Sequence, residues 1–301
     1  MHKPTITIGI PAYNEEANIK HLLVSVLGQN QVNYDLAEII VISDGSKDRT
    51  VFEAESVNDA RILVIEKREN RGLPFTQNEI GERARGDILV MLDADILPVG
   101  DHFVEKIIEP ILAGDGIDLV SADTVPACPK TFFEKIIVDS HEFKQYMYRK
   151  INKGDTIYLC HGRARAFSKR LYKTIRWPSP QHGEDAFSYL FCISRGFAFA
   201  YQHKAEVIFR SPSNWRDYVR QSQRFLDGQE IMTKDYPPKL VRKEYALPKK
   251  IIIETMLVFL LKKPITTTLF LLMHTYIRFF MSRKNKNFAR WETSKTSKRI
   301  L

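Results

Sequence analysis

Two aspartates, Asp93 and Asp95, follow a short apolar run and are the residues of this chain best suited to chemistry. The run Ile88–Leu92 has the length and character of a fully buried strand. At the end of such a strand, the chain can turn both carboxylates toward the crevice in which open α/β sheets bind ligands. Two hard oxygen donors there suit Mg²⁺ or Mn²⁺, usually shared with a ligand's phosphates. The alternative is that the pair only ends the strand and caps a turn.

Other polar residues stand at the ends of predicted elements. Asp44 ends a second apolar run that begins at Glu38, and Asp185 lies near the start of a predicted helix that follows Gly183. Arg224 belongs to a basic and aromatic helix predicted over residues 214–228. The alternatives are structural: Asp185 would only complement its helix dipole, and Arg224 would be a surface residue.

The elements that must position these residues alternate through the first hundred residues. Strand patterns occupy residues 5–10, 38–43, 61–65 and 88–92, and helix patterns occupy residues 14–28, a short stretch from 50, and 75–85. In this pattern Asn14 is the predicted N-cap of the first helix and Gly28 its end. The alternation predicts βαβ units in a mostly parallel sheet, with the strands' carboxyl ends at one edge. Asp44, Asp93 and Asp95 are expected to converge there.

No glycine-rich phosphate-binding motif supports the site. The chain has no G-x-G-x-x-G after its first strand and no G-x-x-x-x-G-K-[ST] anywhere. A nucleotide bound at this edge must therefore be held by carboxylates, a metal and basic side chains.

The last fifty residues differ from the rest. Residues 251–261 and 265–281 are two apolar runs, each shorter than the ~20 residues that a spanning helix needs. Each predicts a helix with a broad apolar arc and a narrow polar stripe, which either lies on a membrane, spans it with tilt, or packs into the protein. We therefore expect a catalytic domain over residues 1–240 and a membrane-associating segment with a basic tail over 241–301.

The charge and cysteine content narrow the class of protein. The 301 residues carry a net charge of +9, and residues 282–301 hold seven basic residues against one acidic residue. Such a tail indicates contact with an anionic partner, either a lipid surface or nucleic acid; the alternative is a solvated tail without a partner.

The three cysteines, Cys128, Cys160 and Cys192, form no C-x-x-C pair and are interpreted as small buried residues. The N-terminus lacks a signal peptide's apolar region, so the catalytic part is expected in the cytosol.

Five motifs together resemble family 2 glycosyltransferases of the GT-A fold. They are, in chain order, Pro11-Ala12-Tyr13-Asn14-Glu15-Glu16, Asp44-Gly45-Ser46-Lys47-Asp48-Arg49-Thr50, Asp93-Ala94-Asp95, Gly183-Glu184-Asp185 and Gln221-Ser222-Gln223-Arg224-Phe225. Each motif is weakly specific alone, but the five occur in the family's order over residues 11–225. The resemblance implies an α/β, Rossmann-like, mostly parallel sheet flanked by helices, followed here by a pair of apolar or amphipathic helices.

The resemblance also implies roles for individual residues. Pro11, Tyr13, Glu15 and Asp44 would contact the nucleotide of a nucleoside diphosphate-sugar, Asp44 at the base. Asp93 and Asp95 would hold the divalent metal, Mn²⁺ or Mg²⁺, and Asp93 also belongs to the donor site. Asp185 would be the general base, and Arg224 would bind the diphosphate. Gly162, Arg163 and Glu184 would lie on the acceptor side.

Two departures from the family pattern bear on mechanism. Some relatives carry a further histidine ligand before the last helix, where this chain reads Val207-Ile208-Phe209-Arg210-Ser211 with only His203 nearby. The last motif ends in Phe225, where processive synthases have tryptophan, which favours the addition of one sugar per encounter. His161 and His182 are interpreted as loop histidines with satisfied hydrogen bonds.

The expected function is an inverting, metal-dependent transfer of a sugar from a UDP- or GDP-sugar to an acceptor hydroxyl or phosphate. The acceptor is expected to be a saccharide or a lipid-linked group at the cytoplasmic face of the membrane, which residues 250–301 would contact; no nucleic-acid partner is expected. The alternatives are a nucleotidyltransferase, which usually has a glycine-rich basic loop absent here, and a non-catalytic protein that binds membrane or nucleic acid.

Overall fold

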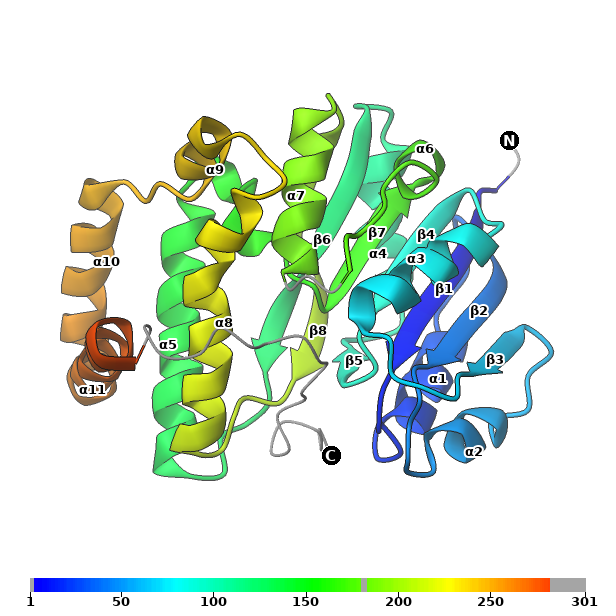
Figure 1. The fold of residues 1–301 in the computed structure, drawn as a ribbon, viewed down its shortest axis with the longest axis horizontal. Coiled ribbons are helices and arrows are strands. Elements are labelled where there is room, and N and C mark those ends of the chain that lie inside the picture. Colours follow the sequence, from blue (N-terminus) through cyan, green and yellow to red (C-terminus); the bar gives the residue numbers. More distant parts are fainter. Residues whose placement is uncertain (1–2, 180–182, 282–301) are drawn as a thin grey trace.

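The structure is a computed structural model that describes residues 3–179 and 183–281, apart from the side chain of Arg224 (Figure 1). Its strands form one mixed sheet of eight in the order β3-β2-β1-β4-β7-β6-β8-β5. The strands are β1 (Thr5–Ala12), β2 (Asp35–Ser43), β3 (Ile62–Glu66), β4 (Ile88–Leu92), β5 (Ile96–Pro98), β6 (Ile117–Pro126), β7 (Ala164–Ser168) and β8 (Ala198–Phe209).

The helices lie between and after these strands. They are α1 (Ile19–Leu27), α2 (Thr50–Glu55), α3 (Leu73–Arg83), α4 (Phe103–Leu112), α5 (Phe132–Arg149), α6 (Lys169–Tyr172), α7 (Glu184–Ser194), α8 (Trp215–Met232), α9 (Pro238–Glu244), α10 (Lys249–Lys262) and α11 (Pro264–Tyr276). Two 3₁₀ turns, η1 (Asn152–Gly154) and η2 (Ile157–Leu159), follow α5, and a π-helical turn, η3 (Ile277–Met281), ends the described part.

The N-terminal half of the sheet is parallel, as predicted. β1 pairs in parallel with β2 and β4, and β2 with β3. Every residue of β4 is buried, because helices cover both faces of the sheet there. Alternate residues of β4 therefore enter two cores: Ile88 and Val90 pack with α1 and α4, whereas Leu89 and Met91 pack with α3 and α7.

A close approach between α3 and β1 depends on Gly9. A Cβ at this position would lie 2.4 Å from Cγ2 of Ile80, so only glycine lets the helix pack at this depth. The contact seats α3 against the strand that leads into the Pro11–Glu16 motif.

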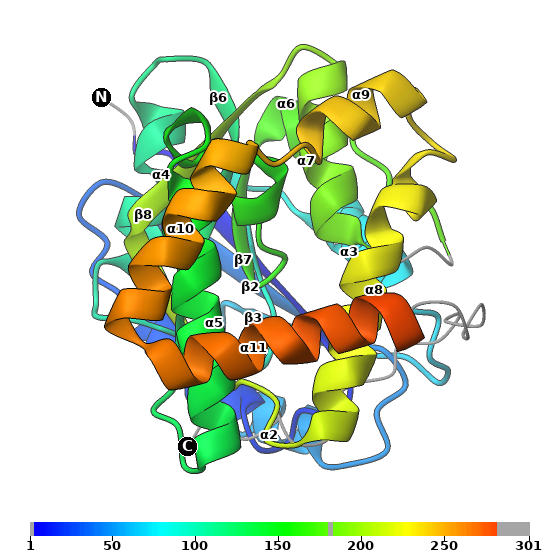
Figure 2. The same cartoon turned by 90° about the vertical axis from the view of Figure 1, so that its left-hand side faces the viewer.

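The C-terminal helices pack around α5, away from the sheet. α11 crosses α5 and α8 in Figure 2. One core joins Phe143 and Met147 of α5 to Phe259 of α10 and Phe270 of α11. A smaller core joins Ile137 of α5 to α8 and η3. The alternative that these apolar helices pack into the protein therefore holds for one of their faces.

The opposite face of the C-terminal helices is exposed. We define the apolar face as the apolar side chains of α10, α11 and η3 that are more than half exposed: Ile253, Leu257, Leu261, Ile265, Leu272, Phe279 and Phe280. Within the described residues, no helix is long and apolar enough to cross a membrane. The basic tail, residues 282–301, lies outside the described part, and the division of the chain at residue 240 stays a prediction.

Two local predictions are wrong. Asn14 does not cap the first helix: its φ is +54°, and α1 begins only at Ile19, after Asn18. The side chain of Asn14 instead accepts a hydrogen bond of 2.7 Å from the backbone N–H of Lys47, so a contact with the next loop determines its conformation. Among the cysteines, Cys160 and Cys192 are buried as predicted, but Cys128 is exposed; none of the three is in a disulfide.

Candidate active site

The predicted site residues lie where three parallel strands end. In the register of the sheet, Gly9 of β1 is level with Ile40 of β2 and Met91 of β4. Asp44 and Asp93, which directly follow β2 and β4, therefore lie beyond the same edge of the sheet. This is the edge that the sequence predicts for the site.

Asp93 is held beside the loop that precedes β7. Its backbone N–H donates a 2.8 Å hydrogen bond to the carbonyl of Arg163, because β7 runs antiparallel to β4 with Ala164 opposite Leu92. The guanidinium of Arg163 stacks on the ring of Phe209, 3.8 Å from its centroid. We call the chain around Gly162 and Arg163, directly before β7, the acceptor-side loop. The hydrogen bond joins this loop to the predicted metal site.

Electrostatics show that the carboxylates of this site are close enough to repel one another. Burial, then the negative charges of Asp95 and Glu184, raises the pKa of Asp93 well above its ordinary value, while Arg163 and Arg165 oppose the rise. A divalent cation would relieve this repulsion, so the pair fits a metal.

The described part of the chain offers a metal few ligands. The described residues contain no group of three or more His, Cys, Asp and Glu side chains that could hold a metal. Asp93 and Asp95 would therefore act as two oxygen ligands, with the remaining positions left to phosphates and water, as is common for Mg²⁺.

Asp185 lies in the first turn of α7, against the acceptor-side loop. Gly183 enters the helix with φ +87°, a conformation that favours glycine. A Cβ on Gly162 would lie 3.2 Å from Oε1 of Glu184 and 3.7 Å from Cβ of Asp185. Gly162, Glu184 and Asp185, predicted from distant parts of the chain, are thus in contact.

The environment of Asp185 suits a general base. Burial, then the charge of Glu184, raises the pKa of Asp185 to about 6, against the opposing charge of Arg165. A base with a pKa near the working pH accepts a proton effectively and is still ionised at pH 7. The role of Asp185 as the base stays a prediction, and so does the alternative that it only complements the helix dipole.

Arg165, on β7, is a candidate site residue that sequence reasoning missed. Its side chain is fully buried, and Nη1 donates to the carbonyl of Glu184 at 3.1 Å and to Oγ of Ser188 at 2.7 Å. Its Nε and Nη2 have no hydrogen-bond partner among the described residues. The signal was present in the sequence: a charged residue between two alanines inside a buried strand is costly unless it interacts with carboxylates.

The two nucleotide-side motifs are bound to each other. The backbone N–H of Asn14 donates to Oγ of Ser46 at 3.0 Å, and that of Glu15 to Oγ1 of Thr50 at 2.7 Å. Pro11 is buried opposite Ile42 at the end of β1, and Tyr13 is half-buried. Pro11, Tyr13 and Glu15 thus lie at the end of β1, beside the β4 end that carries Asp93.

Asp44 has a structural task at the same edge. It is fully buried, and its carboxylate accepts hydrogen bonds from the backbone N–H groups of Arg71, at 3.1 Å, and of Gly72, at 2.7 Å. These bonds hold the loop that enters α3. Its contact with a nucleotide base stays a prediction. So does the diphosphate contact of Arg224, whose side chain lies outside the described residues.

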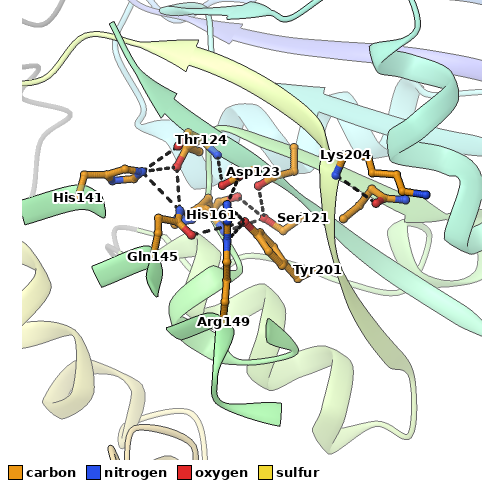
Figure 3. A network of polar contacts seen from close by, with 11 residues as sticks. Ser121, Asp123, Thr124, His141, Gln145, Arg149, His161, Tyr201 and Lys204 are labelled. Carbon is orange, nitrogen blue, oxygen red and sulfur yellow. Dashed lines mark hydrogen bonds and ion pairs between the residues drawn. The ribbon is translucent and has the colours of Figure 1, made fainter. Parts of the chain in front are cut away.

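A polar network ties the acceptor-side loop to the sheet and to α5 (Figure 3). The backbone N–H of His161 donates to Oγ of Ser121 at 2.8 Å, and Nε2 of His161 lies 3.1 Å from Nε2 of Gln145. Arg149 pairs with Asp123 in the same network. His161 is therefore a satisfied loop histidine, as predicted, and positions Gly162 next to it; His182 lies outside the described residues.

A model of the family described as Glycosyl transferase family 2 matches residues 7–176, more than half of the chain. Over 99 residues the chain is 37% identical to the uncharacterized glycosyltransferase YfnE of Bacillus subtilis. This alignment covers 33% of the chain and 25% of YfnE. Over 125 residues the chain is 31% identical to glucosyl-3-phosphoglycerate synthase of Mycobacterium tuberculosis, covering 39% and 37% of the two chains. The matches therefore span less than half the length of these relatives.

Solved structures show the same fold. The mannosyltransferase PcManGT of Pyrobaculum calidifontis, solved with GDP-Man and Mn²⁺, superposes with a TM-score of 0.64 at 18% identity, covering 92% of this chain and 86% of that one. The M. tuberculosis glucosyl-3-phosphoglycerate synthase, solved with Mn²⁺, UDP and phosphoglyceric acid, gives 0.55 at 19% identity, covering 82% and 80%. The predicted GT-A fold is confirmed.

Proposed function

Because the chain belongs to glycosyl transferase family 2, we propose that it transfers a sugar from a nucleoside diphosphate-sugar to an acceptor, with inversion and with Mn²⁺ or Mg²⁺. One observation carries this proposal: a pair of mutually repelling carboxylates, Asp93 and Asp95, lies next to Glu184, the neighbour of the raised-pKa Asp185. The family match favours this activity over the nucleotidyltransferase and the non-catalytic alternatives.

The residues divide the work between leaving group and acceptor. Asp93 and Asp95 hold the metal, which when bound neutralises the charge that develops on the departing diphosphate. The oxygen of the acceptor hydroxyl bonds to the anomeric carbon, and the bond from that carbon to the diphosphate breaks. Asp185 accepts the proton that the hydroxyl loses. Arg165 limits the rise of the pKa of Asp185, which keeps this carboxylate ionised.

The donor is a UDP- or GDP-sugar in this proposal. The solved relatives were obtained with GDP-Man or with UDP. The motifs around Pro11, Tyr13, Glu15 and Asp44 would bind the nucleotide at the end of β1 and β2, and Arg224 would bind the diphosphate. Gly162, Arg163 and Glu184 would contact the acceptor.

The acceptor in this proposal is lipid-linked and is reached at the cytoplasmic face of a membrane. The apolar face supports it, since seven apolar side chains of two packed helices and the turn after them are more than half exposed, and a large exposed apolar surface is typical of an interaction site. Exposed Lys249, Lys250 and Lys262 flank this face, and Glu254 is the only acidic residue between residues 249 and 281. Apolar side chains bordered by lysines suit an anionic bilayer surface.

Transfer assays test the activity. Purified protein with Mn²⁺ and a panel of UDP- and GDP-sugars should release nucleoside diphosphate in the presence of a lipid-linked acceptor. Asp93→Ala, Asp95→Ala and Asp185→Asn should each lower the rate at least 100-fold, of the order expected for a metal ligand or a general base. Asp115→Asn, an exposed loop aspartate, is the matched control and should keep full activity. Full activity in the three site variants would contradict the assignment.

Vesicle sedimentation tests the membrane contact. Replacing Leu261 and Phe280 by serine should weaken binding to anionic vesicles at least tenfold, because these side chains are 85% and 72% exposed and contribute little to the cores. Phe52→Ser, which removes a 58% exposed apolar side chain from α2, is the control. If the variant with serine at positions 261 and 280 binds vesicles as tightly as Phe52→Ser does, the apolar face is excluded as the membrane contact.

A further inference from the structure

Three nitrogen-bearing side chains lie where α5 meets the C-terminal helices: Lys144 of α5 and His274 of α11, both half-buried, and Arg278 of η3, which is exposed. We call them the basic cluster. Nζ of Lys144 lies 5.4 Å from the centroid of the Phe270 ring, and the imidazole of His274 lies 5.8 Å from the same ring. Burial, then the charges of Lys144 and Arg278, lowers the pKa of His274 to about 4. His274 is therefore neutral at pH 7 and presents one N–H donor beside two cations.

The two cations of the basic cluster have no carboxylate partner among the described residues. The other basic residues of α5 and its C-cap are all paired: Lys135 with Asp139, Arg149 with Asp123 and Lys150 with Glu254. The nearby acids Asp139 and Glu142 are both taken by Lys263. Burial alone lowers the pKa of Lys144 to about 8, with no opposing cause. An uncompensated, partly buried cation is costly, and an anion would relieve that cost.

Aromatic side chains connect the basic cluster to Asp185. The hydroxyl of Tyr158 donates to the carbonyl of Tyr245 at 2.7 Å, and their rings meet edge to face at 5.9 Å. Burial, then the charge of Asp185, raises the pKa of Tyr245. Burial raises the pKa of Tyr158 to about 12 against the charge of Arg278. The charge of Asp185 thus reaches Tyr245 and the charge of Arg278 reaches Tyr158, and these two tyrosines contact each other.

A second connection runs along α5 to the acceptor-side loop. His141 lies one turn before Lys144. Burial, followed by the charges of Arg163 and Lys144, lowers the pKa of His141 to about 3, although a hydrogen bond to Thr124 opposes the shift. The charges of Lys144 and of Arg163, the latter beside Gly162, therefore both reach His141.

The apolar face begins where the basic cluster ends. Phe279 and Phe280 directly follow Arg278 in η3, and both are exposed. α10 and α11 carry the rest of the apolar face, while their other side packs on α5. Arg278 of the basic cluster therefore directly adjoins this surface along the chain.

We propose that the basic cluster binds a phosphate or diphosphate group of the acceptor, between the acceptor oxygen at Asp185 and the apolar face. The assignment of this phosphate to the acceptor rests on the proposed function, whereas the binding of an anion by the basic cluster does not. Arg278 would bind phosphate oxygens through its planar guanidinium, Lys144 through its ammonium and His274 through its N–H. The phosphate belongs either to a lipid-linked acceptor or to a soluble phosphate ester, which share this chemistry.

Calorimetric titration with inorganic pyrophosphate tests the anion site without any assay of transfer. The buffer contains EDTA, so that no metal bound by Asp93 and Asp95 attracts the probe. Lys144→Gln and Arg278→Gln should each weaken pyrophosphate binding at least tenfold. Lys144→Arg, which keeps the charge, should retain binding. Lys150→Gln, which removes a paired lysine at the end of the same helix, is the matched control and should bind within twofold of the unchanged protein.

The outcomes separate this inference from the proposed function. The anion site is overturned if the protein does not bind pyrophosphate. It is also overturned if all variants bind pyrophosphate equally and melt at unchanged temperatures. Both results count even if sugar transfer is found. Binding lost in Lys144→Gln and Arg278→Gln upholds the site even if no transfer is detected, in which case the proposed function alone fails. In a second titration, tighter binding of geranyl diphosphate than of pyrophosphate identifies the lipid-linked source, and equal binding identifies the soluble ester.

Discussion

The backbone N–H of Asp93 and the carbonyl of Arg163 are joined by a hydrogen bond of 2.8 Å. This bond couples the end of the central strand β4 to the loop that carries Gly162. The side that would hold the leaving group and the side that would hold the acceptor are thus parts of one rigid edge. A substitution in the loop is therefore expected to affect the chemistry before it affects the fold.

Gly162→Ala tests this coupling. The added Cβ would lie 3.2 Å from Oε1 of Glu184, so the carboxylate must shift by a few tenths of an ångström. We expect kcat/KM for the acceptor to fall about tenfold, of the order expected when a positioning group is displaced. The free energy of unfolding should change by less than about 1 kcal/mol, because a side-chain carboxylate can move.

Gly81→Ala is the control for this substitution, since its Cβ would make only an ordinary 3.5 Å contact with the carbonyl of Tyr172. Steady-state kinetics at varied acceptor concentration and a denaturant titration provide both quantities. Unchanged acceptor kinetics in Gly162→Ala would show that the loop is not on the acceptor side.

The raised pKa of Asp185 predicts a pH dependence of transfer. The carboxylate must be ionised to accept a proton, and its pKa is about 6. The rate should therefore rise with pH through about 6 and level off above about 7. A profile of kcat/KM from pH 5 to 8 measures this limb, and a rate independent of pH between 5 and 7 would refute the role of Asp185.

The same shift predicts that Asp185 destabilises the folded protein at neutral pH. Its folded pKa of about 6 lies above the ordinary value of 3.8, so the native state holds the proton more tightly and loses stability as pH rises between these values. Asp185→Asn should remove this loss and raise the free energy of unfolding by about 1–2 kcal/mol at pH 7.5. The gain should vanish below pH 4. Urea titrations at both pH values provide the comparison.

Arg165→Gln should change both stability and the pH profile. Loss of the buried guanidinium removes one donor from the carbonyl of Glu184 and from Ser188, which should cost about 2–4 kcal/mol of unfolding free energy. The substitution also removes a positive charge that opposes the rise of the pKa of Asp185. The acidic limb of the pH profile should therefore move to higher pH.

Arg83→Gln is the comparison for Arg165→Gln, because it removes an exposed guanidinium from α3. It should leave the pH profile in place and alter stability by less than about 0.5 kcal/mol. A purely structural role of Arg165 would lower stability without moving the limb, and that result would exclude an electrostatic effect on Asp185.

Much of the N-terminal fold could be predicted because its signals are local. The run Ile88–Leu92 is observed as β4 with the same ends, and the helix predicted over residues 75–85 is observed two residues earlier, as Leu73–Arg83. In these segments, burial periodicity and local propensity agree. Asn14 shows the opposite case: its type favours an N-cap, but a hydrogen bond from Lys47, 33 residues away, decides its conformation.

The site could be predicted only where a residue belongs to a motif. Asp93 and Asp95 follow a recognisable strand and Asp185 begins a recognisable helix, so the sequence singles them out as candidates, and their roles stay predictions. Arg165 was missed because its surroundings, α7 and the end of β4, come from segments whose packing on β7 is not visible in the sequence. The basic cluster was missed for the same reason, since 130 residues separate Lys144 from His274.

The sequence by itself determined the strands, the carboxylates at their ends and the apolar character of the C-terminal helices, because each depends on neighbours within a few residues. Only the tertiary structure decided which charges meet. Coulomb energies and desolvation depend on distances between side chains and on burial, and both are set by packing. Packing placed Asp185 beside Glu184 and Gly162, buried Arg165 near the carboxylates, and left Lys144 without a described carboxylate partner.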